Sequence, residues 1–333
     1  MQPCRAVIRL DAIRGNAALL RAKAAGAKLC AVVKADAYGH GGAMVCQALA
    51  GVADCFAVTL VEEGVRLRLA GISADILVLV PPLSIEEAVR AALYGLIVSV
   101  GDGQDIALVS RALAGRGLTV RVHLQVNTGM NRFGFEEAPF AALCGEGLPP
   151  CMRAEGVYSH FYAPHDAAVT REQFSRFCAF RARAEQAFGR LTAHIAATGG
   201  VLAAEGYCLD LVRPGIGLYG YEPQGFARGG LHPAMRVYAQ VAANRIYRGG
   251  GMGYRSLRPR GDALAVVRCG YADGFFRRGR LCMDAAVEES PRKKYERVCV
   301  LSDADECARA CGTISYEVLV RAAARAERVY VNG

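Results

Sequence analysis

Short apolar runs alternate with longer amphipathic stretches over the first two thirds of the chain. Eight runs rich in branched apolar residues predict strands, at residues 30–34, 56–60, 76–80, 96–100, 120–126, 154–159, 192–197 and 210–216. Amphipathic segments such as 11–25 and 84–92 lie between them and predict helices, the second with Ser84 as its N-cap. Eight strand–helix units within about 200 residues predict a (β/α)8 TIM barrel, with a doubly wound sheet as the alternative.

The pattern changes after about residue 225. Glycine pairs and triplets interrupt short apolar runs at 237–242, 263–267 and 297–301, which predict strands, and only 305–311 and 316–326 have a helical pattern. Residues 6–10 form another short run, which we expect to be a strand paired with this second region. We therefore predict an α/β barrel domain over residues 11–225 and a smaller, mostly β domain over 226–333, with the N-terminal strand of residues 1–10 added to it.

Composition and charge narrow the class of protein. With 53% apolar and 21% charged residues, the chain of 333 residues can bury a large core. It has no apolar run near the about 18 residues of a membrane span and no basic start followed by an apolar segment, so we expect a cytoplasmic protein without membrane partners. The net charge of +9 comes from scattered basic residues, so we expect no nucleic-acid partner.

The 13 cysteines are odd in number, unevenly spaced and without a Cys-x-x-Cys motif. This usage predicts reduced, mostly buried thiols. Cys307 and Cys311 lie four residues apart on a predicted helix, but the sequence supplies no two further ligands near them. We therefore expect no metal site.

Lysine is rare, and one lysine has an unusual position. The 40 basic residues comprise 35 arginines and five lysines, four of which are in polar, surface-like segments. The exception, Lys34, ends the apolar run of residues 29–33. Apolar surroundings lower the pKa of a lysine, so its neutral amine can form a Schiff base. The alternative is a lysine that extends from a strand end into solvent.

Polar residues follow the other predicted strands where a barrel has its active face. Arg132 follows the fifth strand, His160 ends the sixth, and Thr198 follows the seventh. The eighth supplies Arg213-Pro-Gly-Ile216. A hydroxyl and backbone N–H groups after strands seven and eight suit a phosphate, and together with a lysine amine they suggest pyridoxal phosphate.

These signals also have structural explanations. His160 can be a core or rim histidine, and the glycines after the eighth strand can form a tight turn. Gly215-x-Gly-x-x-Gly220 formally matches a dinucleotide-binding fingerprint, but Pro214 precedes it and Gln240 occupies the region where an acidic residue is needed. We discount that match.

Seven motifs resemble those of the bacterial alanine racemases, a fold-type III family with a (β/α)8 barrel and a C-terminal β domain. They follow the family's order and span nearly the whole chain: Ala31-Val-Val-Lys-Ala-Asp-Ala-Tyr-Gly-His-Gly41, Thr128-Gly-Met-Asn-Arg-Phe-Gly134, Gly156-Val-Tyr-Ser-His-Phe161, Val212-Arg-Pro-Gly-Ile-Gly-Leu-Tyr219, Gly270-Tyr-Ala-Asp-Gly274, Gly279-Arg-Leu-Cys-Met-Asp284 and Gly312-Thr-Ile-Ser-Tyr-Glu317.

The resemblance implies a role for each matching residue. Lys34 would carry pyridoxal 5'-phosphate as an internal aldimine and act as one of two bases. Arg213 would face the pyridine nitrogen, His160 would flank the ring, and Arg132 would pair with the ring oxygen and the substrate carboxylate. The phosphate would be held by Tyr38, Thr198, Gly215, Ile216 and Tyr316. Tyr271 and Met283 would line the substrate entrance of the partner subunit in a homodimer.

The sequence departs from the family where the second base is expected. Counting back from Tyr271, the position of the family's catalytic tyrosine is occupied by Met252, which has no proton to transfer. Tyr254 lies two residues later, on the same side of an extended strand. It either replaces the lost hydroxyl or is a packed aromatic.

Three further departures surround the substrate entrance. Gln125 stands where many members have a carbamylated lysine, although its amide can still hydrogen-bond Arg132. The family's Asn-Ser pair after strand seven reads Ala197-Thr198. The second domain is shortened, since residues 274–278 run almost directly into 279–284.

The expected function is that of a pyridoxal-phosphate-dependent alanine racemase, an isomerase that interconverts L- and D-alanine and supplies D-alanine, with Lys34 and Tyr254 as its bases. The alternative is a homologue that binds the cofactor but has an altered activity. It would be another amino-acid racemase, a lyase, a decarboxylase or a noncatalytic protein, and Met252 is the reason to consider it. A pure interaction scaffold would leave Lys34 and Arg213 without a purpose.

Overall fold

The computed structural model forms two compact units. It describes residues 4–203, 206–223, 225–226, 229–252, 258–276 and 280–332. The barrel unit consists of Arg14–Ala37 and Gly42–Leu231, and the second unit of Met1–Ile13, Tyr38–Gly41 and His232–Gly333. The predicted division of the sequence between residues 225 and 226 stays a prediction.

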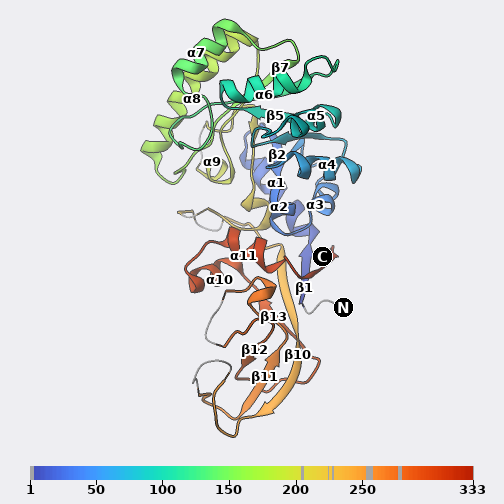
Figure 1. Ribbon diagram of the computed structural model, residues 1–333. Coiled ribbons are helices and arrows are strands. Elements are labelled where there is room, and N and C mark those ends of the chain that lie inside the picture. The colour runs from blue at the N-terminus through green and yellow to red at the C-terminus, as the bar shows by residue number, and fades with distance from the viewer. Residues whose placement is uncertain are drawn as a thin grey trace. The chain divides into compact units, whose positions relative to one another are not determined.

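Eight parallel strands form the sheet of the barrel unit, in the order β8-β7-β6-β5-β4-β3-β2-β9. They are β2 (Lys28–Val32), β3 (Cys55–Val58), β4 (Asp75–Val78), β5 (Ile97–Val100), β6 (Val120–Gln125), β7 (Met152–Tyr158), β8 (Thr192–His194) and β9 (Leu211–Val212). Strands β2, β5 and β7 of this sheet are labelled in Figure 1. A β-bridge between Ala197 and Arg213 joins the two ends of this row, just beyond β8 and β9. The sheet therefore closes toward a barrel, which confirms the predicted (β/α)8 class over the doubly wound alternative.

Helices follow the strands, as the amphipathic segments predict. They are α1 (Leu10–Lys23), α3 (Gly42–Ala48), α4 (Val61–Leu69), α5 (Ile85–Leu93), α6 (Gly103–Leu113), α7 (Glu137–Glu146), α8 (Ala167–Phe188), α9 (Thr198–Leu202) and the 3-10 turn η1 (Ile216–Tyr219). The short element α2 (Lys34–Tyr38) is a turn with left-handed backbone angles. Helix α5 begins as expected, because Ser84 Oγ accepts a hydrogen bond of 3.1 Å from Glu87 N. Within the described residues, no helix has both the length and the apolarity to cross a bilayer.

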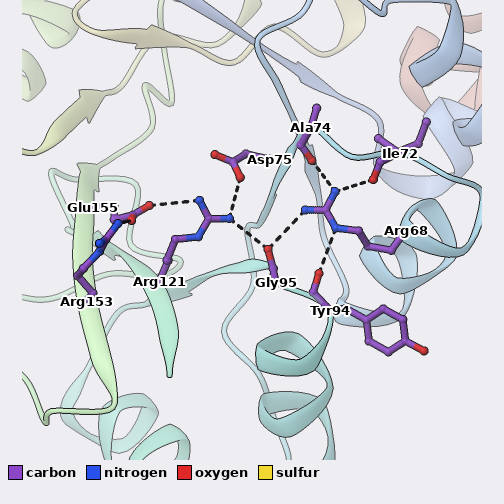
Figure 2. A network of polar contacts seen from close by, with 9 residues as sticks. All are labelled: Arg68, Ile72, Ala74, Asp75, Tyr94, Gly95, Arg121, Arg153 and Glu155. Carbon is purple, nitrogen blue, oxygen red and sulfur yellow. Dashed lines mark hydrogen bonds and ion pairs between the residues drawn. The ribbon is translucent and has the colours of Figure 1, made fainter. Parts of the chain in front are cut away.

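Two arginines connect the loops at the N-terminal ends of the strands (Figure 2). Arg68 on α4 donates hydrogen bonds to four carbonyl groups, those of Ile72, Ala74, Tyr94 and Gly95. Arg121 on β6 pairs with Asp75 Oδ1 at 2.7 Å and with Glu155 Oε2 at 3.5 Å. Because the active face of a barrel is at the opposite ends of the strands, this network serves stability.

The second unit contains a six-stranded sheet with the path β12-β11-β10-β1-β14, to which β13 adds by pairing with β10. Its strands are β1 (Cys4–Arg9), β10 (Met235–Ile246), β11 (Ala263–Val267), β12 (Ala286–Glu288), β13 (Arg297–Leu301) and β14 (Glu327–Val331), and its other elements are α10 (Ala304–Cys311), α11 (Ser315–Ala322) and the 3-10 turn η2 (Tyr271–Asp273). Strand β1 pairs antiparallel with β10 and parallel with β14. The expected pairing of the N-terminal strand with this region is therefore confirmed.

Some predicted element bounds were wrong. Strand β2 ends at Val32, so Lys34 begins the following turn and does not end the strand. The helix predicted over 316–326 ends at Ala322, and the strand β14 follows after a short turn. That strand is only five residues long and directly follows a helical pattern, so its period of two gives a weak signal.

We predict that Arg68→Ala lowers the free energy of unfolding by about 2–3 kcal/mol, because four carbonyl groups lose a charged donor. Urea denaturation of the full chain measures this change. The matched control is Arg66→Ala on the same helix, whose side chain is 74% exposed and whose loss should change stability by less than about 0.5 kcal/mol. Equal effects of the two substitutions would contradict the role of the network.

Candidate active site

Lys34 begins a turn with an unusual backbone. Ala35, Asp36 and Ala37 have φ values of 51°, 53° and 56°, in the left-handed region. Such a conformation costs an L-residue about 1–2 kcal/mol, so consecutive residues keep it only where neighbouring groups hold them. Here Glu63 Oε1 accepts a hydrogen bond of 2.6 Å from Ala35 N, and Asp36 Oδ1 accepts one of 2.6 Å from Gly42 N. These two hydrogen bonds hold the left-handed turn that Lys34 begins.

Lys34 differs from the other four lysines, all of which are exposed. It is half-buried, and burial lowers its pKa. The positive charges of Arg132 and Arg213 lower the pKa further, while Glu63 acts in the opposite direction. A larger fraction of the amine is therefore neutral, which makes it a better nucleophile.

Arg213 is a buried cation, only 3% exposed. Its Nη1 donates to His194 Nδ1 at 2.5 Å and its Nη2 to the Ser159 carbonyl oxygen at 2.7 Å. Its guanidinium carbon lies 4.9 Å from the centre of the Tyr158 ring. Burial lowers the pKa of Arg213, but an arginine stays charged in a protein. In the described part of the chain no carboxylate pairs with it, so its charge is available to a bound electron-rich group.

Two buried histidines form a chain of hydrogen bonds that starts at Arg213 and holds its guanidinium in place. Because an arginine can only donate, His194 Nδ1 accepts, and His194 Nε2 then donates to His123 Nδ1 at 2.8 Å. Burial and the charge of Arg213 lower the pKa of His123 to about 3 and that of His194 well below its usual value. Both rings are thus neutral and do not compete with a ligand for the charge of Arg213.

Sequence reasoning missed these histidines and Glu63. His123 and His194 lie inside the apolar runs that predict strands, and a polar residue within a buried strand was the available signal. Gly156 on β7 makes room for His123, because a Cβ there would lie 2.7 Å from the imidazole ring.

His160 lies beside Arg213, with 3.4 Å between its Nδ1 and Arg213 Nη2. Its backbone carbonyl accepts a hydrogen bond of 3.2 Å from Gln173 Nε2 on α8. Burial, together with Arg213 and Arg132, lowers the pKa of His160 to about 3. The ring is therefore neutral at physiological pH and suited to packing against a flat ligand.

Thr198 links the loops after β8 and β9. Its Oγ1 accepts hydrogen bonds of 3.2 Å from both Gly215 N and Gly217 N. A Cβ on Gly217 would lie 2.7 Å from Thr198 Cγ2, so this close approach requires glycine. The N–H of Ile216 donates to no other described residue. Thr198 and Ile216 thus offer donors for an anion, whereas the N–H of Gly215, predicted to hold a phosphate, donates to Thr198.

Tyr38 and Tyr316 come together in the second unit. Their ring centroids are 5.9 Å apart and the rings are tilted by 53°. Burial raises the pKa of Tyr316 to about 12, so its hydroxyl stays protonated and can donate a hydrogen bond. The two tyrosines predicted to hold a phosphate are therefore neighbours.

The residues predicted to line the substrate entrance are also neighbours in the second unit. Tyr271 N donates to the Cys282 carbonyl at 3.1 Å, and Ala272 N donates to the Met283 carbonyl at 2.9 Å. The side chains of Tyr271 and Met283 are 37% and 55% exposed, as a surface that meets another subunit would require.

The residues around the expected second base differ in their surroundings. Met252 is buried, with 2% of its surface exposed, whereas Tyr254 lies outside the described residues. Gln125 Oε1 is buried and accepts no hydrogen bond from the described residues, so the expected contact with Arg132 is not made. Arg132 itself is exposed, with its guanidinium 6.0 Å from the Phe133 ring centre.

Two family profiles match consecutive parts of the chain. The profile of the alanine racemase N-terminal domain matches residues 8–223, and that of the alanine racemase C-terminal domain matches residues 234–330. The matches leave only short segments uncovered.

Individual relatives match over nearly their full length. The alanine racemase of Beutenbergia cavernae is 36% identical, with 99% of this chain and 98% of that protein covered. The alanine racemase from D-cycloserine-producing Streptomyces lavendulae superposes with a TM-score of 0.90 at 31% identity, covering 100% and 98% of the two chains. The alanine racemase from Bartonella henselae, solved with covalently bound pyridoxal phosphate, gives a TM-score of 0.86 at 25% identity, covering 99% and 100%.

We predict that the buried histidines make the protein sensitive to acid. The folded pKa of His123, about 3, is below its ordinary value of 6.5, so between these pH values the unfolded chain binds a proton that the folded chain does not. Stability then falls as the pH falls, by about 1.4 kcal/mol per pH unit for each such histidine. Urea denaturation between about pH 6 and 4 measures how the free energy of unfolding depends on pH. In His123→Asn the slope of this dependence should be shallower by about 1.4 kcal/mol per pH unit.

The matched control for this prediction is His165→Asn, which removes an exposed histidine. It should keep the slope of the parent protein. An unchanged slope in His123→Asn would show that His123 is not held neutral by the fold.

Proposed function

Because the chain belongs to the alanine racemase family, we propose that it interconverts L- and D-alanine with pyridoxal 5'-phosphate held by Lys34. The observation that carries this proposal is the position of Lys34. Its amine has a lowered pKa and interacts with the charges of Arg213 and Arg132 at the active face of the barrel. A nucleophilic amine near two positive charges suits an anionic aldehyde.

The residues of the barrel unit fit this cofactor. The positive charges of Arg132 and Arg213 both act on the amine of Lys34, and the carboxylate of Glu63 acts on it in the opposite direction. The cofactor carries a phosphate, for which Thr198 and Ile216 offer donors. The resemblance to the family also assigns the hydroxyls of Tyr38 and Tyr316, which are neighbours of each other, to this phosphate. When bound, its ring withdraws the electrons left behind as the α-proton of an amino acid departs.

Arg213 and His160 would keep the cofactor ring in a defined state. A guanidinium cannot accept a proton, so Arg213 can only donate to a ring nitrogen, which then remains unprotonated. His160 is neutral and would pack against the ring without giving it a proton. Lys34 would move the α-proton on one face, and Arg132 would bind the substrate carboxylate.

Racemisation through two bases needs a second proton carrier on the face opposite Lys34. Met252 has no exchangeable proton, so we assign the role to Tyr254, two residues later in the sequence. We also propose that the protein is a cytoplasmic homodimer that supplies D-alanine. Tyr271 and Met283 are exposed, and each would complete the partner's site.

A second candidate function rests on Met252. If no hydroxyl replaces the tyrosine, the chain would bind the cofactor but catalyse another reaction, as a different amino-acid racemase, a lyase or a decarboxylase, or none. Gln125, whose Oε1 accepts no hydrogen bond within the described chain, also indicates a changed environment for Arg132.

We predict that Lys34 is the attachment point of the cofactor. Borohydride reduction of the protein loaded with pyridoxal phosphate should add the cofactor mass to the peptide that contains Lys34. Lys34→Ala should lose this adduct and lower racemisation at least about 1,000-fold, because a covalent anchor and a base are both removed.

The control is Lys28→Ala, which changes an exposed lysine at the start of β2, the strand that precedes Lys34. It should keep both the adduct and the rate. An adduct on another lysine would overturn the assignment of Lys34, whatever the activity.

We predict that Tyr254 acts across the subunit interface. Tyr254→Phe should lower racemisation at least about 100-fold and should abolish α-deuterium exchange from only one enantiomer of alanine, because Lys34 still serves the other face. Tyr295→Phe, which alters a tyrosine that is 67% exposed in the same unit, should behave as the parent.

Co-expression distinguishes a shared site from a site within one subunit. If Lys34→Ala and Tyr254→Phe subunits assemble at random, half of the dimers are hybrids with one intact site of two, so about one quarter of the parent activity should return. Full exchange from both enantiomers in Tyr254→Phe would show that Tyr254 is not the base. An inactive Tyr254→Phe protein without recovery on co-expression would contradict the shared site.

A further inference from the structure

Two cysteines and an aspartate, far apart in the sequence, meet inside the second unit. Cys4 is 0%, Cys269 3% and Asp273 2% exposed. Their Sγ and carboxylate oxygen atoms all lie within 4.8 Å of one another. All three belong to the sheet and its connections, so the fold of this unit fixes the cluster.

The pairing of β10 explains how the cluster forms. Cys4 of β1 pairs with Ala239 of β10, and Val267 at the end of β11 pairs with Val241 of β10. These two positions on β10 are only two residues apart, so the start of β1 lies near the end of β11. The chain then continues through Cys269 into η2, where Asp273 Oδ2 accepts a hydrogen bond of 2.9 Å from Gly270 N. The carboxylate is thereby held beside both thiols.

The second carboxylate oxygen of Asp273 lacks a hydrogen-bond donor among the residues that the structure describes. Asp273 Oδ1 is buried and accepts no hydrogen bond from the described residues, and its nearest cation is Arg325, whose Nε is 3.6 Å away. A buried acceptor that lacks a donor costs about 1–3 kcal/mol, so this oxygen would gain from an additional partner.

We propose that Cys4, Cys269 and Asp273 bind a thiophilic divalent cation such as Zn²⁺. Thiolate and carboxylate are ligands that Zn²⁺ takes at about 2.3 and 2.1 Å in tetrahedral geometry, which places the ligand atoms roughly 3.5–3.8 Å apart. The ligand atoms, within 4.8 Å of one another, need a shift of about an ångström to reach this spacing. A water or the Arg268 carbonyl oxygen, 3.9 Å from Cys4 Sγ, would provide the fourth ligand.

The charges of the cluster balance with a divalent ion bound. Two thiolates and one carboxylate carry three negative charges, and the ion together with Arg325 supplies three positive ones. A buried cluster without net charge avoids the large cost of isolated ions in a protein interior. The bound ion would tie the N-terminal strand to the turn that carries Tyr271. This site is independent of the proposed reaction.

The test uses the full-length protein loaded with its cofactor, kept in a reductant that does not bind metal. Co²⁺ serves as the probe, followed by difference spectra of thiolate-to-cobalt charge transfer and by metal content after gel filtration. The parent should retain one Co²⁺ per chain, displaceable by Zn²⁺, and release about two protons as the thiols bind. At metal concentrations about 100-fold above Kd, the ratio of folded to unfolded protein should rise about 100-fold.

Variants separate this site from the other cysteines. Cys4→Ser and Cys269→Ser should each lose the bound Co²⁺ and the metal-dependent stabilisation. Asp273→Asn should weaken binding more than about tenfold, since loss of even an outer contact costs about 10–100-fold. The control Cys299→Ser changes an exposed thiol of the same unit and should bind as the parent does. If Asp273→Asn does not fold, Cys4→Ala tests the site with a small apolar residue in place of the thiol.

Three results would overturn the proposal. One is metal retention no higher in the parent than in Cys4→Ala. Another is unchanged binding in both serine variants, which would assign the metal to other thiols. The third is a disulfide between Cys4 and Cys269 in air with no metal bound under reducing conditions, which would identify the pair as a redox pair.

Discussion

The buried charge of Arg213 is the constraint on which the active face depends. Its guanidinium follows β9, and its hydrogen bonds reach the end of β8 at His194 and the segment after β7 at Ser159. His194 in turn contacts His123 on β6. A buried cation is costly unless its donors are satisfied. The same contacts that satisfy it therefore bind together the C-terminal ends of strands from one side of the barrel.

The groups that accept hydrogen bonds from Arg213 are uncharged, and this keeps its positive charge available to a ligand. A carboxylate beside Arg213 would neutralise it and reduce its attraction for a ligand. Here the acceptors are a carbonyl oxygen and an imidazole whose pKa lies well below its usual value. The fold thus maintains a positive charge in a dry position, and it holds the strained turn after Lys34 through Glu63. The buried charge of Arg213 and the left-handed turn after Lys34 both lower the stability of the fold at the proposed active site.

Much of the barrel could be predicted from the sequence because each buried parallel strand is a local apolar run. Lys34 could be found because a lysine next to such a run is rare in a chain rich in arginine. The left-handed turn was not predictable, since Ala35 and Ala37 have no local preference for positive φ. The contact between His123 and His194 joins residues 71 positions apart, and the cluster of Cys4 with Cys269 depends on the register of β10. Such contacts follow from strand pairing, which local patterns do not encode.

The central claim is that this site racemises alanine despite the methionine at position 252. The most direct measurement follows the purified protein with added pyridoxal phosphate, starting from L-alanine and from D-alanine in separate reactions. Enantiomers have equal free energies in water, so the account predicts that both reactions converge on equal amounts of the two forms. A protein that binds the cofactor but leaves both enantiomers unchanged would contradict the account and favour the altered activity that Met252 suggests.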